Sequence, residues 1–329
     1  MSSNKFAHRA DAIRKPLILF ITAATSISGA GHMMRCLTYA KSLRYMGCEV
    51  FFDSVIEMPW VKKIVDTEQI SWQAKPDVTY DLVILDSYDP ILLQQRLDQY
   101  SYRKSIQICD SSTPIMGVDG VIWLDPCPPQ VVKEGIKPRV LAAGVIYLMQ
   151  DMLCQKMSLP PKASSVLVVL GGSPSKSVID EIVKLLDSPK YESVTFHVLS
   201  DYIPRATNQK KNFRFYPLGT DMVPLLNFCD TIITSAGTSL WIQFSNLRVM
   251  GVVGVVENQR ANYLYVVEKD LACGLGFLEQ DSLVLDDSSL EKLLFESDYR
   301  SQLSLQMNEF VDSRGVEKLA TLIRSFVVG

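Results

Sequence analysis

The chain has 329 residues, of which 47% are hydrophobic and 21% are charged. Since a single domain usually has about 100–200 residues, this length predicts two domains, each with enough apolar material for a core. The formal net charge is −3 and charges of both signs are interspersed, which argues against a nucleic-acid binder with a basic face. A phosphorylated ligand is not excluded, because backbone amides can bind phosphate locally.

Residues 1–15 are polar and slightly basic, and we expect them to form a flexible leader. The apolar run that follows is short, contains Thr22 and leads into a glycine motif, so a buried strand is favoured over a signal peptide. No other segment has the ~20 apolar residues that span a membrane, so a soluble, cytoplasmic protein is expected. The seven cysteines, an odd number without a CxxC pair, favour a reducing compartment over disulfides or a zinc site.

The first elements along the chain form a strand, a helix and a second strand. The continuous apolar run at 17–23 predicts a strand buried on both faces of a parallel sheet. A glycine-bearing loop follows at 26–31, and apolar residues at helical spacing predict a helix at 33–43 that ends by Gly47. A strand is expected next at 49–53, which makes a β-α-β unit of the kind that builds parallel sheets.

The same alternation continues to residue 158, with strands expected at 81–86, 105–109 and 120–124 and a helix at 90–100. The pattern then restarts after a proline-containing linker at 160–165. Later strands are expected at 166–170, 194–199, 213–216, 231–234 and 251–256, with helices at 178–186, 221–229 and 240–245 and a mostly helical C-terminal third. Two such runs predict two doubly wound α/β domains, 16–158 and 159–329.

In a doubly wound sheet, ligands bind beyond the carboxyl ends of the strands. Four loops with functional composition are expected there, at 26–32, 171–175, 235–239 and 257–260. Glycine lets a backbone approach a phosphate closely, and the N-terminus of the next helix offers unpaired N–H groups. Each loop alone could also be an ordinary turn or a helix cap.

His32 is the titratable residue beside the first glycine loop, in a chain with only three histidines. The stretch Gly29-Ala30-Gly31-His32 lacks the further glycine of a dinucleotide fingerprint. A neutral imidazole can take a proton from water or from a sugar hydroxyl, so His32 is the candidate base. Asp86, Tyr88 and Asp110 follow strands and are expected at the same edge of the sheet, as site residues or as surface caps. Trp60 is expected in the core.

The first motif resembles that of a known family, the UDP-sugar hydrolases of pseudaminic acid biosynthesis and the related spore-coat polysaccharide proteins, which belong to the GT-B superfamily. It reads Gly29-x-Gly31-His32-x-x-Arg35-Cys36-Leu37-x-x-Ala40-x-x-Leu43, followed by Gly47-x-x-Val50-x-Phe52. The similarity extends through Leu85-Asp86-x-Tyr88, Gly171-Gly172, Ser235-Ala236-Gly237-x-Ser239 and Glu257-Asn258-Gln259 to a closing helix after 312–318.

The resemblance implies a GT-B-like fold, two Rossmann-like domains facing a cleft, with the last helix able to pack back on the N-terminal domain. UDP would bind the second domain, and water activated by His32 would displace it from the sugar, without a metal or other cofactor. The implied substrate-binding residues are Gly29, Gly31, Arg35, Asp86, Tyr88, Asn258 and Gln259. The implied nucleotide-binding residues are Gly171, Gly172, Ser235, Gly237, Thr238, Ser239 and Gln243.

The sequence departs from the family at two positions. Gln243 stands where many relatives have a glutamate suited to the ribose, and the stretch at 147–152 lacks an expected arginine. The nucleotide, UDP or alternatively CMP, and the substrate therefore stay open. The first hypothesis is a nucleotide-sugar hydrolase that releases a free amino or deoxy sugar for nonulosonic acid or surface glycan synthesis. The alternatives are a glycosyltransferase, with His32 as base on a glycan acceptor, and a non-enzymatic sugar-nucleotide sensor.

Overall fold

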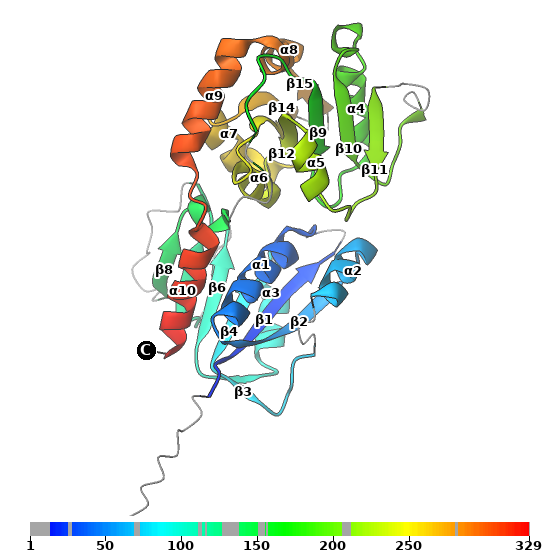
Figure 1. Cartoon of the computed structure of the whole chain (residues 1–329). Helices are drawn as coiled ribbons and strands as arrows, with labels where there is room; N and C mark the ends of the chain where they lie inside the picture. Colours follow the sequence, from blue (N-terminus) through cyan, green and yellow to red (C-terminus); the bar gives the residue numbers. More distant parts are fainter. Residues whose placement is uncertain are drawn as a thin grey trace, which may run out of the picture.

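The computed structural model describes residues 14–25, 28–68, 73–110, 114–115, 117–126, 138–150, 155, 157–205, 212–279 and 282–328. The expected leader therefore lies almost entirely outside the described residues, as do Cys127 and Cys154. Figure 1 shows two main sheets, one built from the first half of the chain and one from the second, each with helices packed on its faces. The predicted α/β class with two Rossmann-like units is confirmed.

The first sheet has six parallel strands in the order β2-β1-β4-β6-β7-β8. Its strands are β1 (Leu17–Ala24), β2 (Glu49–Ile56), β4 (Leu82–Asp86), β6 (Ser105–Cys109), β7 (Gly120–Trp123) and β8 (Arg139–Ala143). The helices of this half are α1 (Gly31–Tyr45), α2 (Pro59–Thr67), α3 (Pro90–Leu97) and the 3-10 turn η1 (Val145–Leu148), and a small separate sheet pairs β3 (Thr79–Tyr80) with β5 (Ser101–Tyr102). The central strands are buried along their whole length, as their continuous apolar sequences predict.

The second sheet has seven strands in the order β11-β10-β9-β12-β13-β14-β15. These are β9 (Ser165–Val169), β10 (Thr195–Leu199), β11 (Phe213–Tyr216), β12 (Thr231–Ser235), β13 (Val249–Gly254), β14 (Cys273–Glu279) and β15 (Ser282–Leu285). All neighbours are parallel except β14 and β15. The helices are α4 (Lys176–Leu186), α5 (Val223–Phe228), α6 (Thr238–Phe244), α7 (Arg260–Glu268), α8 (Asp287–Phe295) and α9 (Ser297–Phe310), with 3-10 turns η2 (Pro189–Tyr191) and η4 (Glu257–Gln259).

The strand order indicates which edge of each sheet binds a ligand. In the first sheet β1 lies between β2 and β4, and in the second sheet β9 lies between β10 and β12. The chain therefore winds outward in both directions from β1 and from β9. Ligands of doubly wound sheets bind at such switch points, beyond the carboxyl ends of the two flanking strands. The loops after β1, β4, β9 and β12 are the candidates.

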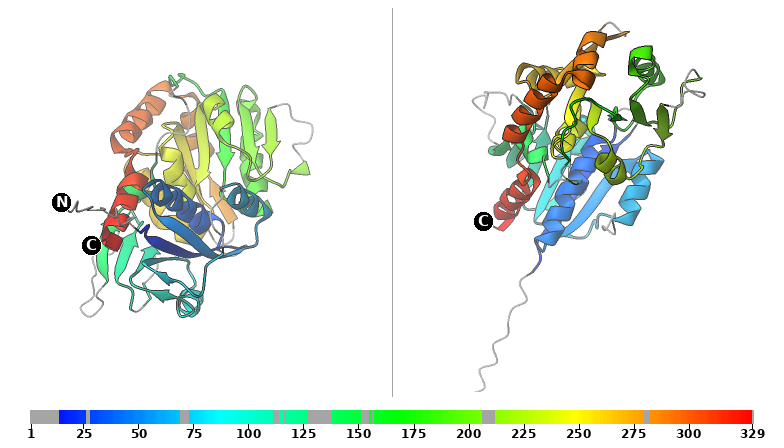
Figure 2. Two further views of the ribbon diagram at one scale, coloured as in Figure 1. Left: turned by 60° about the horizontal axis from the view of Figure 1, so that its bottom comes forward. Right: turned by 45° about the horizontal axis from the view of Figure 1, so that its top comes forward.

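The last helix, α10 (Gly315–Val328), returns to the first half of the molecule. It packs against α1, η1 and β8, and both views in Figure 2 place the red helix beside the blue one. A Cβ atom at Gly315 would overlap the carbonyl oxygen of Ile146, so a glycine is needed where α10 begins against η1. The buried residues Val316, Leu319 and Ile323 then join the core of the first half.

Several elements were not predicted from the sequence. The helices α2 and α7 and the strands β8, β14 and β15 were missed, and the two last strands lie in a region expected to be mostly helical. β14 is interrupted by Gly274 and Gly276, which weakens its apolar alternation.

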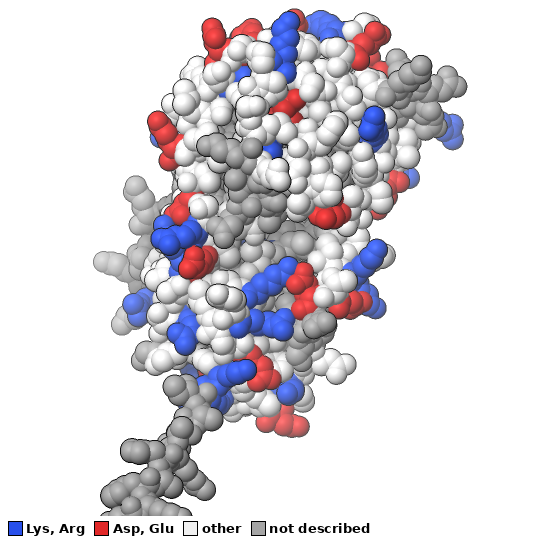
Figure 3. Space-filling view, in the orientation of Figure 1, with Lys and Arg blue, Asp and Glu red and all other residues white. Residues whose placement is uncertain are grey.

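Charged residues of both signs are mixed over the face seen in Figure 3, in both halves. Among the helices that the structure describes, none is long and apolar enough to cross a membrane.

Candidate active site

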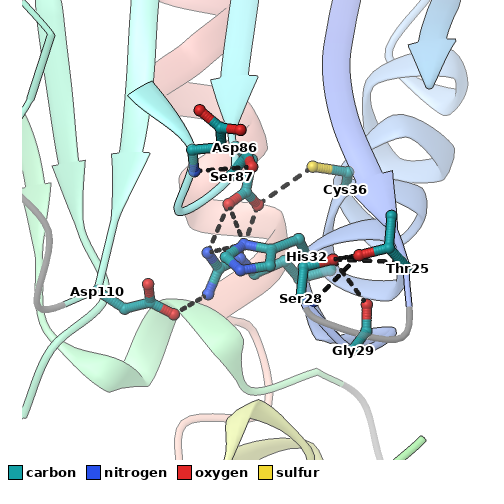
Figure 4. A network of polar contacts seen from close by, with 10 residues as sticks. Thr25, Ser28, Gly29, His32, Cys36, Asp86, Ser87 and Asp110 are labelled. Atoms are coloured by element: carbon teal, nitrogen blue, oxygen red, sulfur yellow. Dashed lines mark hydrogen bonds and ion pairs between the residues drawn. The ribbon is translucent and has the colours of Figure 1, made fainter. Parts of the chain in front are cut away.

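The loop between β1 and α1 is a compact turn held by its own hydrogen bonds. The backbone N–H of Ser28 donates to Thr25 Oγ1 at 3.1 Å, and the N–H of Gly29 donates to the Thr25 carbonyl at 2.9 Å. Gly29 has φ = 70°, in the left-handed region that favours glycine. The turn lets α1 begin at Gly31, so that His32 lies in the first helical turn, facing the end of β4 (Figure 4).

His32 is held by a carboxylate from the neighbouring strand. Asp86, the last residue of β4, is fully buried, and its Oδ1 lies 2.7 Å from Nδ1 of His32. The register pairs Asp86 with Thr22 of β1, which brings the end of β4 beside the start of the loop. Nε2 of His32 makes no hydrogen bond with any described residue. The imidazole is therefore oriented through Nδ1, and Nε2 is the nitrogen left for chemistry.

Arg35 lies one helical turn after His32 and joins two carboxylates. Its Nε donates to Asp86 Oδ2 at 2.7 Å and its Nη2 donates to Asp86 Oδ1 at 2.5 Å, a two-point fork. Its Nη1 donates to Oδ2 of Asp110, the residue after β6, at 2.5 Å. The guanidinium is buried, with an exposed fraction of 2%. Arg35 was expected to bind substrate, but its side chain is directed to Asp86 and Asp110.

The charges around Asp86 keep it ionised. Burial alone would raise the pKa of its carboxyl, but the charge of Arg35, the electrostatic interaction with His32 and the hydrogen bonds from both hold it well below the ordinary value. The Cys36 thiol donates to Asp86 Oδ2 at 3.3 Å, and burial together with the negative charge of Asp86 raises the pKa of that thiol well above its usual range. Asp86 is thus a carboxylate that accepts hydrogen bonds, and Cys36 stays protonated.

Tyr88 lies between the buried His32 and the protein surface. Its ring meets the His32 ring edge to face, with the centroids 4.3 Å apart, and 40% of the residue is exposed. Burial, and then the negative charge of Asp110, raise the pKa of the Tyr88 hydroxyl. The structure thus brings together His32, Asp86 and Tyr88 as expected, and adds Asp110 as the partner of Arg35. Asp110 lies at this edge because β6 pairs in parallel with β4, so that both strands end on the same side of the sheet.

The second domain contributes the loops after β9 and β12. Gly171 has φ = 93°, and a Cβ atom there would lie 3.5 Å from Oγ of the buried Ser235. Gly237 precedes α6, whose first turn contains Thr238 and Ser239. The amide of Gln259 lies over Gly237, since a Cβ atom there would be 3.2 Å from its Nε2. These loop residues therefore gather at the switch point of the second sheet.

Two other expected nucleotide or substrate residues lie differently. Gln243 is buried, and its Oε1 accepts a hydrogen bond from Nδ2 of Asn246 at 3.3 Å, inside the domain. Asn258 is exposed in η4. The burial of Gln243 depends on how α6 packs, which no local pattern in the sequence reveals.

The two sets of loops touch each other. A Cβ atom at Gly31 would lie 3.3 Å from Thr238 Oγ1, and a Cβ atom at Gly172 would lie 2.7 Å from Cβ of Ala30. Trp60 of α2 packs against the hydrophobic core, as expected, and also against Gly172 and Gly219 of the second domain. Added Cβ atoms at those two glycines would each come within 2.9 Å of its ring or Cβ. The contact joins the switch points of both sheets. Among the described residues no group of three or more His, Cys, Asp or Glu could hold a metal ion.

Several solved structures share this architecture. UGT89C1 from Arabidopsis thaliana, in complex with quercetin, is 14% identical with a TM-score of 0.59, over 94% of this chain and 99% of that chain. The glycosyltransferase SnogD from Streptomyces nogalater is 16% identical with a TM-score of 0.54, over 95% and 100% of the two chains. MurG from Acinetobacter baumannii is 13% identical with a TM-score of 0.56, over 94% and 99%. The chain has the GT-B fold.

No protein-family model matches the sequence, and no curated protein matches it. The similarity to solved structures therefore concerns the GT-B fold, which places two Rossmann-like units with their switch points together. The expected GT-B fold is confirmed. The His32 and Asp86 pair lies at that junction, on the side of the first unit.

Proposed function

We propose that the chain is a glycosyltransferase that uses a nucleotide sugar, most simply a UDP-sugar, and that His32 is its base. The observation that carries this proposal is the hydrogen bond that Nδ1 of His32 donates to the buried Asp86, at the edge where the two GT-B units meet. Similar structures with UDP and with UDP-L-rhamnose, both of UGT89C1, support a UDP-linked donor. The quercetin complex of that protein supports a hydroxyl-bearing acceptor.

In this mechanism Nε2 of His32 accepts the proton of the acceptor hydroxyl as its oxygen attacks the anomeric carbon. The bond from that carbon to the diphosphate oxygen breaks, and the nucleoside diphosphate leaves with the electron pair. Asp86 keeps the proton on Nδ1 and stabilises the imidazolium that forms. The leaving anion is held by the backbone N–H groups of Gly237, Thr238 and Ser239 at the start of α6, so that charge developing on the diphosphate meets fixed donors.

Hydrolysis by the same site is the second candidate, and one observation favours it. The side chain of His32 is only 4% exposed, so a water molecule reaches Nε2 more easily than a bulky acceptor does. The chemistry is otherwise unchanged, because water takes the place of the acceptor hydroxyl. The products would be a nucleoside diphosphate and a free sugar.

The first prediction distinguishes glycosyl transfer from hydrolysis in one experiment. The protein is incubated with a panel of UDP-sugars and CMP-sugars, with and without hydroxyl acceptors, and nucleotide release is followed. For glycosyl transfer, release requires an acceptor and falls by about 10²–10⁴-fold in His32→Ala, since a positioned base contributes a factor of this size. Release without an acceptor, lost in the same variant, would establish hydrolysis. No consumption of any nucleotide sugar would remove both enzymatic proposals and favour a sensor.

The second prediction separates nucleotide binding from catalysis. Gly237 has φ = −87° and ψ = −166°, which any residue can adopt, so Gly237→Val is expected to fold. Its side chain would meet the Gln259 amide and fill the loop before α6. We expect UDP affinity, measured by calorimetry, to fall at least tenfold in Gly237→Val and to stay within about twofold in His32→Ala. Equal affinity in Gly237→Val and the wild type would place the nucleotide elsewhere.

A further inference from the structure

Nδ1 of His32 lies within hydrogen-bond distance of two groups with opposite demands. Oδ1 of Asp86, 2.7 Å away, can only accept, whereas Nη2 of Arg35, 2.8 Å away, can only donate. A proton on Nδ1 satisfies Asp86 and leaves Nε2 bare. A bare Nδ1 satisfies Arg35 and puts the proton on Nε2, where the imidazole can no longer accept one. Only the first tautomer makes a base.

The orientation of Arg35 decides between the two tautomers. Its guanidinium is planar and rigid, so the positions of its nitrogens are fixed together. The fork to Asp86 directs Nε and one N–H of Nη2 toward that carboxylate, and Nη1 is bound to Asp110 Oδ2 at 2.5 Å. Asp110 thus holds the outer end of the guanidinium, which keeps the inner end on Asp86.

The charge balance favours the same tautomer. Two carboxylates, Asp86 and Asp110, surround the single guanidinium of Arg35, which leaves one negative charge to be met at Nδ1. Within the described part of the chain, Arg35 is the only cation paired with Asp110. The charge of Asp110 is therefore compensated through Arg35. Without it, the guanidinium would lose its outer partner, and the Nη2 group that already lies 2.8 Å from Nδ1 could turn its N–H from Asp86 to a bare Nδ1.

We propose that Asp110 is a positioning residue that fixes the catalytic tautomer of His32 by holding Arg35 on Asp86. Asp110 does not take part in proton transfer itself. The proposal rests on the proposed role of His32 as base, but the tautomer can be measured without any substrate. Failure of the enzymatic proposal and failure of this one are therefore distinguishable.

The test is a ¹⁵N NMR measurement on the full chain with labelled histidine. The sequence has three histidines, and the signals of His32 are identified by their loss in His32→Asn. At about pH 8, where an imidazole is ordinarily neutral, we expect the Nδ1–H form in the wild type. In Asp110→Asn we expect the Nε2–H form to predominate, with kcat lowered by about 10²-fold and KM within about twofold. Asp110→Glu keeps the carboxylate and should retain the wild-type tautomer.

Asp53→Asn is the matched control. Asp53 accepts hydrogen bonds from Arg96 at 2.8 Å and from Tyr100 at 3.0 Å, so it is another carboxylate paired with an arginine in the same domain, away from His32. It should change neither the tautomer nor kcat. An Nε2–H tautomer in the wild type, or an Nδ1–H tautomer kept in Asp110→Asn, would overturn the proposal. Asp110→Ser serves as a second charge-removing variant if Asp110→Asn does not fold.

Discussion

Asp86→Asn is expected to lose both stability and activity, by about 1–3 kcal/mol in the free energy of unfolding and by about 10²-fold or more in kcat. Asparagine keeps the size of the side chain but removes the charge, so the buried Arg35 would lose one of its two charged partners and keep only Asp110. The amide would also offer an N–H to Nδ1 of His32, which favours the tautomer that cannot accept a proton at Nε2. Urea unfolding and steady-state kinetics measure the two effects.

The ion pair of Asp53 with Arg96 again provides the comparison. Its side chains are 11% and 34% exposed, so solvent screens the pair, and Asp53→Asn should cost about 1 kcal/mol or less. A loss in Asp86→Asn no larger than in this control would mean that the buried network contributes little. Unchanged kcat in a folded Asp86→Asn would remove Asp86 from the mechanism.

The same variant changes the response to acid. The pKa of Asp86 is lowered in the folded protein, below the value of 3.8 that it has when unperturbed. Its contribution to stability is therefore fully present above the unfolded value and is lost as the pH falls below about 4 toward the folded pKa. Between about pH 5 and pH 3, the free energy of unfolding should fall more steeply with decreasing pH in the wild type than in Asp86→Asn. Parallel curves would show that Asp86 is not linked to folding.

Gly172→Ala is expected to separate the two switch points. Its Cβ atom would lie 2.7 Å from Cβ of Ala30 and 2.9 Å from Cζ2 of Trp60, closer than real side chains approach. One side of the contact must move, and a displacement of about 1 Å at a reacting centre can cost about 10²-fold in rate. We expect kcat/KM to fall between about tenfold and 10²-fold. Small-angle X-ray scattering should show a larger radius of gyration.

A second substitution can restore the contact. Ala30→Gly removes the atom nearest to the new Cβ, so the double variant Ala30→Gly with Gly172→Ala should regain part of kcat/KM. The rescue should be partial because Trp60 still crowds the position. A double variant no more active than Gly172→Ala would show that the loss arises within the loop after β9, for instance through nucleotide binding, and not from contact with the first half.

Much of this fold could be predicted from periodicity, because buried parallel strands are continuous apolar runs. The predicted bounds of β6 and β11 agree with the structure, and His32 was expected beside the end of β1. The missed α2 begins at Pro59 without a side-chain cap, and its single apolar face is short. Trp60 could not be assigned to the contact between the two halves, since its sequence neighbourhood does not distinguish that contact from packing within one core.

The site was only partly predictable for a related reason. Sequence position indicated that His32 and Asp86 lie at strand ends, but the pairing of β1 with β4 across 57 intervening residues was needed to make them neighbours. The direction of a long side chain is harder still. Arg35 lies in the same motif as His32, yet its role follows from the position of Asp110 directly after β6, which depends on the order of the strands.

The return of α10 to the first half has a consequence for biosynthesis. Val316, Leu319 and Ile323 complete the core around α1 and η1, but the ribosome makes them after the whole of the second sheet. The core of the first half therefore stays incomplete, with part of its apolar surface exposed, while about half of the polypeptide is still being translated. Folding of the domain that carries His32 is thus expected to finish only after translation, in one step with the docking of α10.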